Sequence, residues 1–207
     1  MARTIDVPGL KTGSIRSLHG ASNRLGYIGT AESEHELVFQ RWVYAMTAVE
    51  IHSIWERYVE RRLVAALNHD AGHFIDKEEL KGVTRVSAGF AFYIVRSGQK
   101  YFDIRSSGEL LDKSDKLLGQ PNPFRALTLN VRNYLDAMYA IRNLVVHGST
   151  AAMTAYNREM NSKYGVRYPP KPGEFLCAIE RRAGAPGRGR TRLSGIISVV
   201  TDAINQT

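Results

Sequence analysis

Cysteine, acidic side chains and long apolar runs are all scarce in this sequence of 207 residues. Its single cysteine, Cys177, excludes an internal disulfide, and with it the small disulfide-stabilised folds of secreted proteins. No apolar run approaches the roughly 20 residues that a membrane-spanning helix requires. No charged segment followed by an apolar one, as in a secretion signal, opens the chain. We therefore expect a cytoplasmic protein without a membrane partner.

Metal ligands are also scarce. His69 and His73 are spaced like a ligand pair and have Asp70 beside them, but no cysteine or further histidine lies nearby in the sequence. Because zinc sites generally take three or four such ligands, we expect these residues to belong to a loop. We predict no metal site and no cofactor.

Basic residues, by contrast, are abundant. The chain has 28 lysines and arginines against 20 acidic residues, which gives a formal net charge of +8. This excess favours a polyanionic partner, with nucleic acid ahead of an anionic membrane surface. Hydrophobic residues make up 43% of the chain, enough for the core of a globular domain.

The first half of the chain predicts one long helix after an irregular start. Residues 1–33 contain scattered Gly, Ser and Thr with little periodicity, which indicates an arm or loosely packed segment. From Leu37 to Leu67 apolar residues recur three or four apart without Pro or Gly, which predicts a helix of about 30 residues. Thr30 or Ser33 is the expected N-cap.

The middle of the chain is ambiguous. Residues 76–105 fit either a helix to about Arg96 followed by a short extended segment, or two short strands around a Ser-Gly turn. We favour the helix. A short helix capped by Ser107 and ending at Gly119 is expected next.

The second long helix is the best-defined element of the pattern. It is expected to begin at Pro123 or Phe124, with Asn122 as N-cap, and to stop at Gly148. Its apolar stripe consists of Leu127, Val131, Tyr134, Met138, Ile141 and Val145. A shorter helix, an extended crossing segment over 168–182 and a closing helix over 193–204 follow. We predict an all-α bundle with two long antiparallel helices, shorter accessory helices and a small extended insertion.

Polar residues end this second helix in the stretch "IRNLVVHGS". Asn143 and His147 are four residues apart and share a helix face. Arg142 and His147 are five apart, about 140° around the axis, so in an ideal helix they point away from each other. They meet only if the long arginine bends toward the histidine, if the helix is ending, or if a second copy of the chain supplies the other half.

The context of this motif resembles the HEPN superfamily, whose ribonuclease members carry an Arg-polar-x-x-x-His motif at the end of a helix. Here the motif is "RNLVVH". The stretch "AVEIHSIWERYVERRL" is similar to the first long helix of these proteins, and "YFDIRSSGELLDKSDKLLG" followed by "NPF" to their middle region. The resemblance covers residues 34–165, which we expect to form a HEPN-like core between an N-terminal arm, 1–33, and a C-terminal extension, 166–207.

The resemblance implies a metal-independent endoribonuclease that acts as a homodimer, in which two copies of the motif share one cleft. A toxin or phage-defence effector with an antitoxin or other partner protein belongs to the same expectation. His147 would serve as base or acid, because a free imidazole titrates near neutrality. Arg142 would grip phosphate oxygens, and Asn143 would hold the imidazole or the phosphate. The substrate would be single-stranded RNA or tRNA, cleaved by its own 2′-hydroxyl.

A purely structural role for these residues competes with catalysis. In that role Arg142 pairs with Glu50 or Glu56 of the first long helix, and His147 caps carbonyl groups at the helix end. A carboxylate that orients Arg142 would equally well support a catalytic site. The alternative function is a non-catalytic dimeric HEPN-like module that binds nucleic acid or a partner protein through the glycine- and arginine-rich segment 181–192. Its expected nucleic-acid contacts are Arg181, Arg182, Arg188, Arg190 and Arg192.

Overall fold

The computed structural model describes residues 5–28 and 33–207, and these are helical without any β-strand. The predicted all-α fold is therefore confirmed. The elements are α1 (Val7–Gly26), α2 (Glu34–His69), α3 (Gly72–Lys77), α4 (Ala88–Val95), α5 (Ser107–Leu118), a 3-10 turn η1 (Pro123–Ala126), α6 (Leu129–His147), α7 (Thr150–Tyr164), α8 (Pro172–Cys177) and α9 (Arg192–Gln206).

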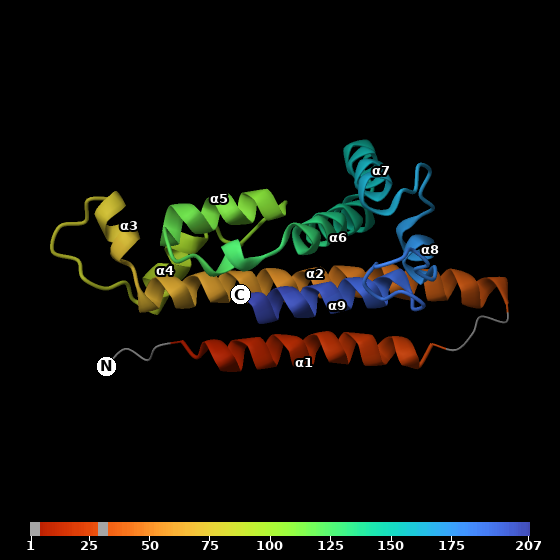
Figure 1. The fold of residues 1–207 in the computed structure, drawn as a ribbon, viewed down its shortest axis with the longest axis horizontal. Coiled ribbons are helices and arrows are strands. Elements are labelled where there is room, and N and C mark those ends of the chain that lie inside the picture. The colour runs from red at the N-terminus through yellow and green to blue at the C-terminus, as the bar shows by residue number, and fades with distance from the viewer. Residues whose placement is uncertain (1–4, 29–32) are drawn as a thin grey trace.

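Helix α2 is the axis of the molecule. It spans 36 residues and begins after the predicted cap Ser33, whose side chain accepts a hydrogen bond from the Glu36 backbone, while the Glu36 carboxylate accepts one from the Ser33 backbone. The other candidate cap, Thr30, lies outside the described residues. Figure 1 shows α2 along the whole length of the molecule, with α1 on one side and α5 and α6 on the other. Helix α6 runs back along α2 in the opposite direction, as predicted.

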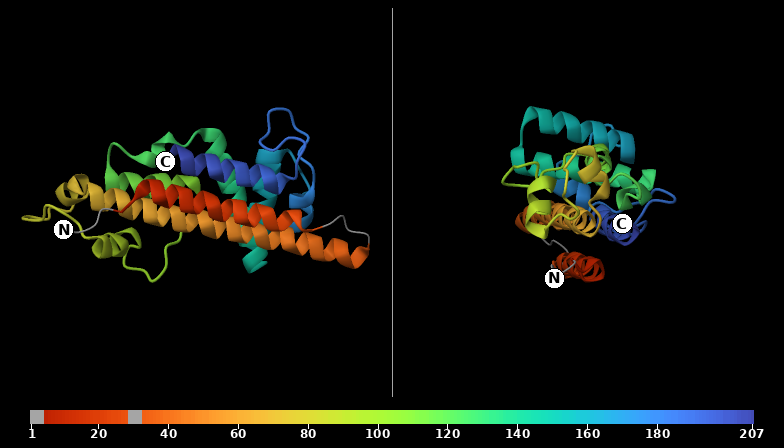
Figure 2. Two further views of the ribbon diagram at one scale, coloured as in Figure 1. Left: turned by 90° about the horizontal axis from the view of Figure 1, so that it is seen from below. Right: turned by 90° about the vertical axis from the view of Figure 1, so that its left-hand side faces the viewer.

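The prediction of an irregular arm over residues 1–33 is wrong for the described residues, because Val7–Gly26 forms helix α1. Figure 2 shows α1 and α2 side by side along their lengths. Leu18 and Ala21 are fully buried, and Leu10 and Leu25 pack against the same core. Four glycines within α1 weaken its helical pattern, so the sequence underestimates a helix that tertiary packing stabilises.

The long helix predicted to run from Asp76 to Arg96 is wrong, and so is the alternative hairpin. The chain forms α3, then an irregular segment, then α4 with Ser87 as N-cap. Positive φ angles at Glu79 and Gly82 turn the backbone between the two helices. Helix α5 then begins one residue earlier than predicted, with Ser106 as its cap, and ends at Gly119 as predicted.

The start predicted for the second long helix also needs correction. Asn122 does act as a cap, but of the short 3-10 turn η1. Leu127 is extended, and α6 begins only at Leu129, with Thr128 as its N-cap. Its predicted apolar stripe is confirmed at the residues that are buried in the core: Leu127, Val131, Tyr134, Met138 and Ile141.

The end of the chain packs back onto this core. Residues 168–182 were predicted to be extended, yet Pro172–Cys177 forms the short helix α8, because Pro172 starts a turn that buries Phe175 and Leu176. The predicted closing helix is confirmed as α9. Within the described ranges no helix combines the length and apolarity needed to span a bilayer.

Candidate functional site

The three polar residues at the end of α6 form one hydrogen-bonded cluster. Arg142 Nη1 lies 3.1 Å from His147 Nε2 and donates to Asn143 Oδ1 at 2.9 Å. His147 is exposed, while Arg142 and Asn143 are partly buried. A guanidinium can only donate hydrogen bonds, so Nε2 of His147 is on the accepting side of this contact. The cluster thus presents a cation and an imidazole nitrogen together at the surface.

Of the three ways in which Arg142 and His147 could meet, the structure shows the first, in which the long arginine bends toward the histidine. The separation of about 140° applies to the directions in which side chains leave the helix axis. Arg142 is long enough for its guanidinium to bend along the helix toward its C-terminus and reach the imidazole. Asn143, the next residue, holds the same nitrogen from the other side. A second copy of the chain is therefore not required to form the pair.

The turn after α6 leaves His147 accessible. Gly148 adopts the left-handed conformation at φ 58°, where its amide bonds to the Leu144 carbonyl and closes the helix. Ser149 follows at once as the N-cap of α7. Because the chain turns away within two residues, no following segment covers the imidazole. The predicted stop at Gly148 is thereby confirmed.

Neither predicted carboxylate supports the cluster. Glu50 pairs with Arg24 of α1. Glu56 lies 3.3 Å from Nδ1 of His52 on its own helix. Among the described residues Arg142 has no ion pair with any acid, so the simpler role, in which it pairs with α2, finds no support. The guanidinium charge remains uncompensated and available to an anionic ligand.

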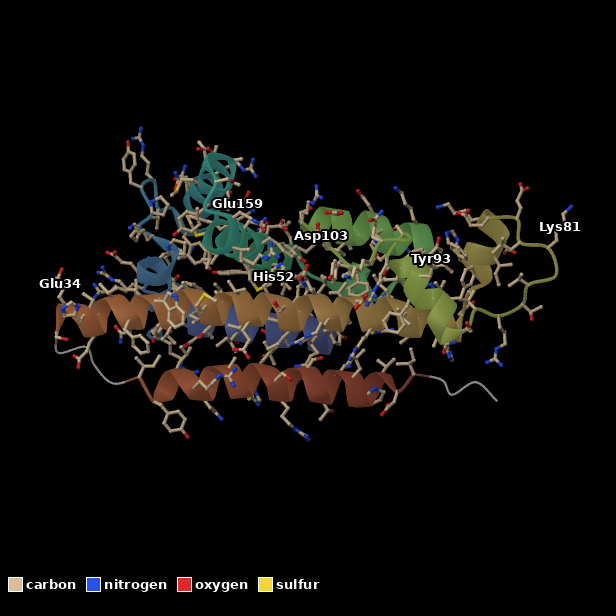
Figure 3. The ribbon with its side chains drawn as sticks, turned by 180° about the vertical axis from the view of Figure 1, so that it is seen from behind. Glu34, His52, Lys81, Tyr93, Asp103 and Glu159 are labelled. Carbon is tan, nitrogen blue, oxygen red and sulfur yellow. The ribbon has the colours of Figure 1, made fainter. Side chains whose placement is uncertain are left out.

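A buried aromatic cluster lies one turn before Asn143 on α6, and the sequence did not reveal it. The Trp55 indole donates to the Tyr139 hydroxyl at 3.0 Å, and the His52 ring packs edge-on against Tyr139. Figure 3 shows His52 between α2 and α6. Burial raises the pKa of Tyr139 far above its usual value, so the phenol stays protonated. These contacts fix the register of α6 on α2 and so the position of the helix end. The i, i+4 spacing of His52 and Glu56 was the available signal.

The arginine-rich segment is only partly free. Glu180 is 2% exposed and accepts hydrogen bonds from the backbone and side chain of Arg182. Arg192 lies 3.9 Å from the same carboxylate and stacks over Phe175. Arg182 and Arg192 are partly buried and lie against this buried carboxylate, with side-chain exposures of 36% and 19%. The predicted contacts that are exposed are Arg181, Arg188 and Arg190.

An apolar groove adjoins the end of α6. It has a volume of about 330 Å³ and is lined by Val38, Arg41, Trp42 and Ala45 of α2, Leu144 and Val145 of α6, and Lys171–Glu174. Trp42 is 58% exposed and stacks on Phe39, which is 59% exposed. Trp42 is thus a surface residue, whereas Trp55 is fully buried. An exposed Trp-Phe pair marks an interaction surface.

Residues 5–28 and 33–207 contain no group of three or more His, Cys, Asp or Glu side chains placed to share a metal ion. The chain matches no protein-family model, and no curated protein or solved structure is significantly similar to it. The chemistry of the α6 end must therefore be argued from its geometry.

Proposed function

We propose that this protein is a HEPN-type endoribonuclease that cleaves single-stranded RNA or tRNA without a metal ion, with Arg142 and His147 as its catalytic residues. The observation that carries the proposal is the 3.1 Å contact between Arg142 Nη1 and His147 Nε2 at an exposed helix end. In this contact a guanidinium, a group that can bind phosphate, lies beside an imidazole, and no described carboxylate pairs with the guanidinium. Those are the two groups that cleavage by the 2′-hydroxyl of RNA requires.

In this mechanism Arg142 moves from Nε2 of His147 to the phosphate when substrate binds, and the freed Nε2 removes the proton of a 2′-hydroxyl. The 2′-oxygen attacks the adjacent phosphorus, the bond from phosphorus to the 5′-oxygen breaks, and an acid returns a proton to that oxygen. The products are a 2′,3′-cyclic phosphate and a free 5′-hydroxyl. Arg142 stabilises the negative charge that builds up on the phosphoryl oxygens. Asn143 keeps the guanidinium in place before substrate arrives.

A dimer would supply the acid, as a second copy of His147. The apolar α2 surface, defined as Val38, Phe39, Trp42 and Met46, supports this part of the proposal. All four side chains are at least 41% exposed, and α2 projects here beyond the other helices (Figures 1 and 2). The surface borders Leu144 and Val145, which belong to the same last turn of α6 as His147. A second copy seated there would bring two cluster sites close together.

The substitution Trp42→Glu tests this surface. A charged side chain in an apolar contact is costly to desolvate, so the dimer is expected to dissociate at least tenfold more readily. Sedimentation equilibrium of wild type and variant measures the change. Tyr168→Glu is the control, because Tyr168 is exposed outside the apolar α2 surface. A wild-type protein that is monomeric at all concentrations would contradict the dimer.

As a HEPN nuclease the chain would act as a toxin or phage-defence effector, held in check by an antitoxin or another partner protein. The primary test of the function uses purified wild type and His147→Ala with single-stranded RNA in excess chelator. Wild type is expected to cleave while the variant does not. If both proteins degrade the RNA at the same rate, the activity does not come from this site. If neither does, the alternative of a non-catalytic binding module gains support.

A further inference from the structure

A second feature outside the α6 end is a groove between α1 and α2, with a volume of about 340 Å³. One wall is α1, with Gly9, Leu10, Gly13, Ser14 and Ser17, and the other is α2, with Ile54, Arg57, Tyr58 and Arg61. The groove is open to solvent, because Gly9, Gly13 and Ser17 lie on its outer edge and are all exposed. A Cβ atom added at Gly13 would meet nothing within 4 Å.

Arg57 and Arg61 are the charged residues of this groove. They are four residues apart on α2, so they lie on one face about one helical turn apart. Both are exposed. Neither forms an ion pair or a side-chain hydrogen bond with any residue that the structure describes. This contrasts with Arg62, the residue next to Arg61, which donates to the Thr207 carbonyl.

No carboxylate neutralises these two arginines. Helix α1 contains no acidic residue. The acids of α2 nearest to them in sequence are Glu56 and Glu60. Glu56 contacts His52, and Glu60 pairs with Arg96. The Asp6 carboxylate lies against Gly9 at one end of the groove and lines a neighbouring hollow together with Arg61, but it forms no ion pair with Arg61. The two guanidinium groups therefore give the groove a net positive potential.

The opposite wall suits a polar backbone rather than an apolar ligand. The partly buried Ser14 side chain contributes a hydroxyl. Tyr58 and Ile54 form the floor and are buried in the core. No exposed large apolar side chain lines the groove, so it offers nothing to insert into a lipid surface. An open channel with paired guanidinium groups along one side and small residues along the other is suited to a chain of phosphates.

We infer that the groove lined by Arg57, Arg61, Gly13 and Ser14 binds the phosphodiester backbone of a nucleic-acid strand. Arg57 and Arg61 each contact a phosphate, and the missing side chain at Gly13 leaves room for the backbone. The site is separate from the α6 cluster, which lies on the other side of α2 (Figure 1). The inference does not depend on cleavage, because binding is measured on a protein with His147 replaced.

The test measures binding of a fluorescent single-stranded oligouridine to the full-length His147→Ala protein by anisotropy over a range of salt concentrations. Adding Arg57→Gln and Arg61→Gln is expected to weaken binding about tenfold. The slope of log K against log salt should fall by about 1.4, or roughly 0.7 for each phosphate that an arginine no longer neutralises. The matched control is Lys81→Gln with Arg85→Gln, which removes the same charge four residues apart in the exposed segment between α3 and α4, where Figure 3 labels Lys81.

A second variant blocks the groove without changing charge. Gly13→Met places a long side chain in the open space, and it should not impair folding because methionine favours a helix more than glycine does. It is expected to weaken oligouridine binding about as strongly as the charge variant. Gly20→Met, on the same helix outside the groove, is its control and should bind as the parent does.

The outcomes separate the possible explanations. If the Lys81 and Arg85 control loses as much affinity as the Arg57 and Arg61 variant, only net charge matters and the inference is wrong. If Gly13→Met binds normally, the strand does not occupy the groove. An oligodeoxyuridine of the same length should bind similarly, since backbone contacts do not read the 2′-hydroxyl. Vesicles of anionic lipid that bind the groove more tightly than either strand would assign it to a membrane instead.

Discussion

Replacing Arg142 by alanine is expected to lower the rate of RNA cleavage by about 10²–10³, the cost of removing one donor that stabilises transition-state charge. The loss should appear in kcat, because the extra negative charge develops only as the 2′-oxygen attacks. Arg142→Lys keeps the charge but not the fork of donors that spans Asn143, His147 and a phosphate. We expect this variant to recover only part of the rate.

Single-turnover cleavage of one RNA by these variants measures the effect. The control is Arg105→Ala, because Arg105 is highly exposed and, among the residues that the structure describes, forms an ion pair only with the exposed Asp103. Its rate should equal that of wild type. The melting temperature of Arg142→Ala should also stay close to wild type, since Arg142 forms no ion pair with a described residue. An unchanged cleavage rate in Arg142→Ala would remove Arg142 from the mechanism.

Glu180→Gln is expected to destabilise the fold by about 3 kcal/mol at neutral pH, the low end of the cost of removing one partner from a buried ion pair. Glu180 is 2% exposed and is the carboxylate that holds Arg182 and Arg192. Its loss leaves the charge of Arg182, which also stacks over Tyr164, without a counter-ion. Urea unfolding gives the change in free energy. Asp103→Asn, which removes an exposed partner of Arg105, should cost less than about 1 kcal/mol.

The same variant has a defined pH dependence. Burial raises the pKa of Glu180, but hydrogen bonds from Arg182 and the nearby charge of Arg192 outweigh it, so the pKa lies below its usual value. A lowered pKa in the folded state gives stability that is complete above the unfolded pKa, about 4.3, and is lost as the pH falls through the folded value. The difference between wild type and Glu180→Gln should therefore shrink on acidification. A constant difference from pH 7 to pH 3 would contradict this account.

The sequence predicted the elements whose local signals agree with their packing. Helix α2 combines the Ser33 and Glu36 capping box with a long apolar pattern, and α6 ends at a glycine that must be left-handed. Helix α1 was missed because its glycines and serines hide the few apolar positions that pack on α2. The single helix predicted from Asp76 to Arg96 was wrong for a different reason. Positive φ angles at Glu79 and Gly82 interrupt a pattern that is periodic enough for one helix.

The sequence singled out Arg142, Asn143 and His147 but did not predict how they contact one another. A helical wheel represents each side chain by the direction in which it leaves the axis, so it could not decide whether Arg142 bends to His147. Glu50 pairs with Arg24 on another helix, and Arg182 and Arg192 stack on the rings of Tyr164 and Phe175. Such tertiary contacts leave no periodic signal. That is why the sequence did not show that two of the five arginines predicted to bind nucleic acid are partly buried.

If Arg142 and His147 cleave RNA through its own 2′-hydroxyl, a single deoxy substitution in the substrate blocks cleavage at one linkage. One RNA is mapped for the linkages that wild type cleaves in excess chelator, and a 2′-deoxynucleotide is then placed on the 5′ side of one of them. We predict that cleavage stops at that linkage, continues at the others and leaves 2′,3′-cyclic phosphate ends. Continued cleavage at the deoxy linkage, or no cleavage of the RNA at all, would contradict the account.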